Sequence, residues 1–154
     1  PDVGGRATSL AYWLVEAGQF EEARLLVDEG LEIRRKALGP EHPQYASTLT
    51  VKASLLLATD RYEEARQLAE EAQRILLLSL PADAWQVAAA MNTQGAALVG
   101  LREYTAAERL LLDSSGGLEQ APIPNLAARG RQRLVELYLA WGRPDEAQKY
   151  RRTK

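Results

Sequence analysis

The side chains best suited to chemistry in this sequence are one histidine, two glutamate pairs and two closely spaced arginines. His42 is the only histidine and lies in RRKALGPEHPQYASTL, residues 34–49. A metal site needs several donor side chains, and a nucleophilic site needs a partnered base. Neither set is present at a workable spacing. The sequence therefore predicts no metal site, no cofactor and no enzyme in this segment.

The acidic and serine-rich motifs have structural interpretations as well. Glu21–Glu22 and Glu63–Glu64 resemble acid/base pairs, but neighbours on a helix point in different directions. We interpret them as first-turn charges that complement the positive end of a helix dipole. The DSSGG stretch at residues 113–117 lacks the Gly-x-Ser-x-Gly pattern of a nucleophile elbow. We predict that it breaks its helix.

The elements that must position these residues form a repeat. GQFEEARLL, DRYEEARQL, REYTAAERL and GRPDEAQKY align along the chain. Phe20, Tyr62 and Tyr104 recur every 42 residues, and a matching alanine recurs at spacings of 42, 42 and 40, namely Ala23, Ala65, Ala107 and Ala147. Apolar residues at three- and four-residue spacing flank each copy, which predicts a helix, a tight turn and a second antiparallel helix.

The prolines and glycines mark the ends of these helices. Gly18 and Gly142 suit left-handed helix termini. The loop around His42 could be an active-site loop or a joint between helix pairs, and the joint explains more: Gly39-Pro40 stops one helix, and Pro43 suits the first position of the next. In the second joint, SLPADAW, we predict a helix that starts at Pro81. APIPN, residues 121–125, forms the third joint.

Composition and charge fit a helical protein whose two ends differ in charge. Ala and Leu dominate the apolar residues, there is no cysteine, and no apolar run approaches the roughly 20 residues that span a bilayer. We expect a cytoplasmic protein without a membrane segment. The first 120 residues carry 11 Lys/Arg against 18 Asp/Glu, whereas residues 121–154 carry 8 against 3. A basic end of this kind marks either a partner-facing surface or ordinary solvated helix faces.

The turn motifs resemble the tetratricopeptide repeat, and EAGQFEEA, ATDRYEEA, GLREYTAA and AWGRPDEA carry the likeness. The 42-residue spacing and the LGPEHP joint are similar to the kinesin-light-chain variety. The resemblance implies an all-α, right-handed solenoid of about four antiparallel helix pairs. We predict one repeat domain over residues 1–154, with units near 3–40, 41–80, 81–120 and 121–154, as part of a larger protein.

The resemblance also implies which side chains face the concave groove, mainly from the first helix of each unit. The candidate peptide-binding residues are Thr8, Tyr12, Thr50, Ser54, Asn92, Thr93, Arg129, Gln132 and Arg133, with Ser9, Val15, Val51, Leu57, Ala96, Val99 and Glu136 beside them. Arg129 and Arg133 lie four apart, on one helix face, and could hold carboxylates or phosphates. The alternative is an exposed helix face without a ligand.

The ending RLVELYLAWGRPDEAQKYRR resembles the tails of repeat arrays that follow bacterial serine/threonine protein kinase domains. This implies that the chain is the C-terminal docking or sensing segment of a larger signalling protein. We expect it to bind a protein or peptide, and the paired arginines favour an acidic or phosphorylated peptide as its partner.

Three other partner classes can be weighed against a peptide. Nucleic acid is disfavoured because interleaved stacking aromatics are lacking. Self-association could occur through an apolar N-terminal face around Leu10, Trp13 and Leu14. The runner-up is a structural or oligomerising spacer with no peptide ligand.

Overall fold

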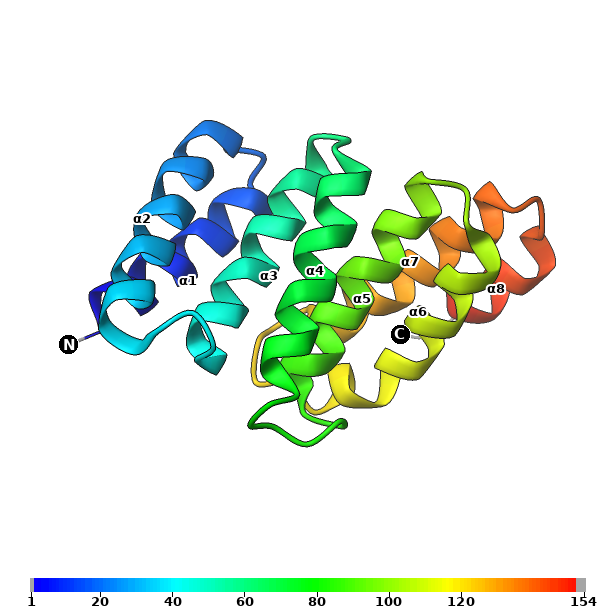
Figure 1. Ribbon diagram of the computed structural model, residues 1–154. Helices are drawn as coiled ribbons and strands as arrows, with labels where there is room; N and C mark the ends of the chain where they lie inside the picture. The colour runs from blue at the N-terminus through cyan, green and yellow to red at the C-terminus, as the bar shows by residue number, and fades with distance from the viewer. Residues whose placement is uncertain (1, 152–154) are drawn as a thin grey trace.

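The computed structural model describes residues 2–151, and within that range every regular element is a helix (Figure 1). The eight helices are α1 (Val3–Glu16), α2 (Phe20–Leu38), α3 (Pro43–Ala58), α4 (Tyr62–Leu76), α5 (Trp85–Gly100), α6 (Tyr104–Glu119), α7 (Leu126–Ala140) and α8 (Pro144–Arg151). None of these helices is long and apolar enough to cross a membrane.

The helices form four antiparallel pairs that stack side by side (Figure 1). Helices α1, α3, α5 and α7 contact one another in sequence, whereas α2, α4, α6 and α8 make no such contacts among the described residues. The first helix of each pair therefore lies on the inner, more crowded layer, and the second lies on the outer layer. This arrangement confirms the predicted all-α solenoid of four helix pairs. The assignment of residues 1–154 to one domain stays a prediction.

The turn inside each pair depends on one left-handed residue, and it recurs at the repeat spacing. Gly18 and Gly142 have φ of 76° and 74°, as predicted from their type. Asp60 and Arg102 occupy the matching positions with φ of 62° and 63°. The backbone conformation is thus common to all four copies although the residue type is not. Asp60 accepts a hydrogen bond from the Tyr62 hydroxyl (2.8 Å), while Arg102 is exposed.

Small residues set the distance between packed helices. The matching alanines Ala23, Ala65, Ala107 and Ala147 have no exposed surface. In α5, a Cβ added at Gly95 would lie 2.9 Å from the side chain of Leu111 in α6. A larger residue at any of these crossings would push the helix axes apart, because the interior is already close-packed.

The joint around His42 is structural, as predicted. Gly39, with φ of 94°, follows the last residue of α2, and Pro43 opens α3. His42 is the N-cap of α3, and its Nδ1 accepts a hydrogen bond from the backbone N–H of Gln44 (3.1 Å). The ring thereby satisfies one of the free amides at the helix start.

Two boundary predictions were wrong. Helix α5 begins at Trp85 rather than Pro81, because residues 81–84 first close a turn in which the Ala84 N–H donates to the Pro81 carbonyl (3.0 Å). The DSSGG stretch does not break α6, which continues to Glu119. Ser114 and Ser115 donate their hydroxyls to carbonyls three residues back, at 3.1 and 2.7 Å. Gly117 lets α6 lie directly against Ala88 of α5.

The strained turn residue in the third pair offers a test. A left-handed conformation costs a non-glycine residue roughly 1–2 kcal/mol, and a glycine at the same position avoids this cost. Part of the resulting gain in stability is lost, because glycine has more conformational freedom in the unfolded chain. We expect Arg102→Gly to raise the free energy of unfolding by about 0.5–1 kcal/mol in denaturant titrations. Arg109→Gly, at an exposed position inside α6, should instead lower it by about 1 kcal/mol. A loss of stability in both variants would contradict this account of the turn.

Candidate functional site

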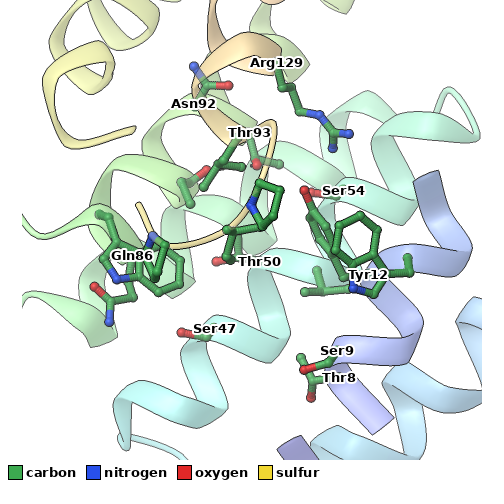
Figure 2. Close-up of a pocket in the computed structure, with 18 of the residues that line it drawn as sticks. Thr8, Ser9, Tyr12, Ser47, Thr50, Ser54, Gln86, Asn92, Thr93 and Arg129 are labelled. Atoms are coloured by element: carbon green, nitrogen blue, oxygen red, sulfur yellow. Dashed lines mark hydrogen bonds between the residues drawn. The ribbon is translucent and has the colours of Figure 1, made fainter. Parts of the chain in front are cut away.

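The four inner helices together line a hollow with a volume of about 320 Å³ (Figure 2). Its walls come from α1, α3, α5 and α7, together with the joint between α6 and α7. Figure 2 shows that joint as a yellow segment that runs between Gln86 on one side and Tyr12 on the other. The hollow is therefore the concave groove of the solenoid, with a segment of the same chain lying across it.

Most of the predicted groove residues meet in this hollow. Eight of the nine candidate binding residues line it: Thr8, Tyr12, Thr50, Ser54, Asn92, Thr93, Arg129 and Arg133. Ser9 and Val51 line it too. Gln132 does not, and its exposed amide donates to Glu136 (3.4 Å). Leu57, Ala96, Val99 and Glu136 border a smaller, separate hollow, and Val15 packs on the core of the first pair. The part of these residues in binding stays a prediction.

The threonine hydroxyls in the groove are already used as donors. Thr50 and Thr93 donate to the carbonyls of Ala46 and Ala89, at 3.3 and 2.9 Å. Thr8 lies 2.8 Å from the Gly4 carbonyl and 3.0 Å from the Thr48 hydroxyl. A hydroxyl that donates to its own helix keeps its lone pairs as acceptors. These positions therefore offer acceptors and methyl groups, rather than donors, to anything in the groove.

Asn92 joins three helices rather than opening towards a ligand. Only 2% of its surface is exposed. Its Nδ2 donates to Ser114 Oγ of α6 (3.1 Å), and its Oδ1 accepts from Arg133 Nη1 of α7 (2.8 Å). Both ends of the amide are engaged, so the side chain fixes the position of Arg133 at the groove.

The two arginines at the α7 end have different surroundings. Arg129 forms an ion pair with Glu16 of α1 and lies over the Tyr12 ring, with its guanidinium carbon 5.8 Å from the ring centroid. Arg133 is half-buried, and removal from water, followed by the positive charge of Arg129, lowers the pKa of its guanidinium to about 10. With two guanidinium groups and the one carboxylate of Glu16 in this contact, this end of the groove is cationic.

A buried arginine at the opposite end was missed by the sequence reasoning. Arg34 of α2 is 8% exposed and borders the hollow. It donates to the Gln44 carbonyl (2.8 Å), the Thr48 hydroxyl (3.0 Å) and Asp2 Oδ2 (3.0 Å). The backbone N–H of Gly5, and then Arg34, hold the pKa of the Asp2 carboxyl below its usual value. The repeat register contained the signal, because the matching positions hold the buried apolar residues Leu76 and Leu118.

The apolar walls were also missed. Trp13, Trp85 and residues 122–124 line the hollow. Ile123 is anchored against the buried cluster of Ala88, Leu118 and Leu126. Two prolines in one joint signal a rigid extended segment, but nothing in the sequence indicates which face of the stack that segment crosses. Among residues 2–151, no three His, Cys, Asp or Glu side chains are grouped in a way that could hold a metal ion.

Comparison with known proteins places the fold. Residues 6–77 match the tetratricopeptide repeat family. The nearly identical TPR-like repeats of a candidate kinesin light chain from Podosopora anserina share 22% identity with this chain, with a TM-score of 0.70 over 94% of this chain and 69% of theirs. BtubC (BKLC) from P. vanneervenii shares 16% identity, with a TM-score of 0.71 over 96% of this chain and 59% of its own length. No curated protein sequence matches significantly.

These matches show a tetratricopeptide-like fold, which is similar to that of the repeats of kinesin light chains. At identities of 16% and 22%, these structures are evidence for the fold alone. The predicted link to a bacterial serine/threonine kinase finds no counterpart among them and stays a prediction.

The bridging amide gives a prediction for the site. Asn92→Ala would leave the buried Ser114 hydroxyl and the half-buried Arg133 without this partner. Because unsatisfied buried polar groups carry their full desolvation cost, we expect a loss of about 2–3 kcal/mol in the free energy of unfolding. Gln86→Ala, on the same helix and lining the same hollow, should change it by less than about 0.5 kcal/mol. Equal effects of the two substitutions in denaturant titrations would show that Asn92 is not structural.

Proposed function

We propose that this chain is a protein-interaction module that holds an extended peptide in its concave groove. The observation that carries the proposal is the single hollow in which side chains from all four inner helices converge. Solenoids use concave surfaces of this kind for binding, and tetratricopeptide repeats commonly mediate protein–protein contacts. A catalytic role is not supported, because the one histidine is a helix cap.

The chemistry of the walls favours a peptide with an apolar body and an acidic end. Trp13, Trp85 and the proline joint supply apolar surface, and the serine and threonine oxygens can accept hydrogen bonds from a peptide backbone. Arg129 and Arg133 lie at one end, where carboxylates or phosphates would be attracted. A nucleic-acid ligand is less well supported, since few aromatic faces are available for stacking.

The larger context is proposed on sequence resemblance alone. The ending at residues 133–152 supports a docking or sensing segment of a bacterial signalling protein that carries a kinase domain and works in the cytoplasm. Residues 152–154 lie outside the described range.

Selection from a random peptide library tests the groove. Ser54 is half-buried in the groove wall, so Ser54→Trp should fill the hollow and reduce binding of the selected peptides at least tenfold. Gln67→Trp, at an exposed site on the outer helix α4, is the matched control and should bind like the unmodified chain. Affinities would be measured by fluorescence anisotropy. Selected peptides that bind both variants equally would rule out the groove as their site.

A second candidate function is stacking through the outer face of α1. Trp13 corresponds in the repeat to Leu55, Ala97 and Leu137. Those three residues are buried, at 5%, 0% and 0% exposure, whereas Trp13 is 47% exposed. Leu10, at 52%, corresponds to Lys52, Gln94 and Leu134, of which only Leu134 is buried. Leu14, the third residue of the predicted face, is only half-exposed and packs on the first pair's own core.

In each later pair, the residue that corresponds to Trp13 is therefore covered by the preceding pair. We propose that a second copy of the chain covers this face when nothing else does. In sedimentation velocity runs over a range of concentrations, Trp13→Glu should abolish self-association. Leu25→Glu is the control, because Leu25 is 61% exposed on α2 and corresponds to the exposed polar residues Gln67 and Arg109. A chain that is monomeric at every concentration would contradict the stacking proposal.

A further inference from the structure

Side-chain contacts of Arg129 join α7 to α1 across the groove: an ion pair with Glu16 and a contact with the Tyr12 ring. Glu16 comes from the last turn of α1, and Arg129 comes from the first turn of α7, 113 residues later. The two helices themselves are not in contact. The ion pair is only partly exposed, with 28% of the Glu16 side chain and 23% of the Arg129 side chain accessible. It therefore spans the groove from wall to wall.

Both partners depart from the repeat. The positions that match Glu16 hold Ala58, Gly100 and Ala140, and those that match Arg129 hold Gly5, Ser47 and Ala89. Small residues in the other copies leave the groove open at these points. The contact is thus a feature of this chain rather than a general consequence of stacking the pairs.

Arg133 adds a positive charge beside this contact, which Glu136 on the same helix offsets only in part. It lies one helical turn beyond Arg129 and bonds to the neutral Asn92 amide. No carboxylate within residues 2–151 forms an ion pair with it. Its lowered pKa, with desolvation as the main cause and Arg129 as the next, agrees with this imbalance. An anion that reached both guanidinium groups would relieve it, whereas Glu16 satisfies Arg129 alone.

We propose that the Glu16–Arg129 ion pair is a latch across the groove, which a carboxylate of a bound acidic peptide opens by bridging Arg129 and Arg133. This rests on the proposed peptide-binding function and adds its regulation. Glu16 acts as an internal competitor, so every acidic ligand must displace it before it can occupy the cationic end. Release of the latch removes the charged contact between α1 and α7, which are then connected only through α3 and α5, so the groove can widen.

The latch can be tested without any ligand. The chain has no cysteine, so Ala17→Cys and Ala128→Cys, both at exposed positions near the two latch residues, provide unique sites for spin labels. We expect a narrow distance distribution by pulsed electron paramagnetic resonance in the otherwise unmodified chain. It should broaden towards longer distances in Glu16→Gln and in Arg129→Gln. Glu29→Gln, which removes the same charge from an exposed site on α2, should leave it unchanged.

The charge-reversed double variant Glu16→Arg/Arg129→Glu should restore the narrow distribution, which separates loss of the ion pair from damage to the fold. If the spin-label distance distributions of the Glu16→Gln variant and the unmodified chain were superimposable, the latch proposal would be overturned. Because no peptide is present, that result would leave the proposed groove function standing.

Competition is tested with a blocked hexaglutamate peptide as the probe. Removal of a partly exposed competitor should tighten binding to Glu16→Gln about fivefold relative to Glu29→Gln, which has the same net charge. Equal affinities, or no binding of hexaglutamate to either variant, would overturn the competition. Inorganic phosphate at matched ionic strength is the second arm. Opening of the spin-labelled latch by phosphate alone would show that the site takes free anions rather than acidic peptides.

Discussion

How closely the helix axes can approach governs the rest of this structure. Alanine is fully buried at the matching point of every outer helix. At Gly95 of α5, the side chain of Leu111 lies so close that there is no room for a Cβ. Because little side chain separates the helices at these points, each pair can nest against the next. The inner helices then meet in an unbroken series while the outer ones spread apart, which produces a concave surface. The groove follows from the small residues even though few of them line it.

Buried polar side chains occur at positions where a single residue departs from the repeat. Arg34 replaces a buried leucine, and Ser114 stands where the earlier pairs have Gly30 and Ala72. Arg34 bonds to Gln44 and Thr48 of the next pair and to Asp2 of its own pair, and Ser114 bonds to Asn92 of its own pair. Burial of polar groups is tolerated when such bonds are made. The bonds from Arg34 to Gln44 and Thr48, and from Arg133 to Asn92, link neighbouring pairs.

The fold could be predicted from local rules, whereas much of the site could not. The structural roles of the repeated alanines, the left-handed glycines and the Gly-Pro joint depend on residues close to them in the sequence. Their spacing was therefore enough to predict the helices and turns. The continuation of α6 through DSSGG depends on contacts with Ala88 and Asn92 of another helix, which no local rule contains. Likewise, eight candidate residues could be found by register, but the position of residues 122–124 and the reach of Glu16 follow from the curvature of the whole stack.

The Glu16–Arg129 contact changes how the array shares its stability. A solenoid is close to a one-dimensional chain, in which each repeat interacts only with its neighbours and the ends fray independently. Here the first and fourth pairs interact directly through side chains 113 residues apart. In addition to the contacts between neighbouring pairs, the first pair therefore contacts the last, so the series of contacts closes into a ring. Opening of either terminal pair removes an interaction from the other, so the two ends are thermodynamically coupled and fray cooperatively.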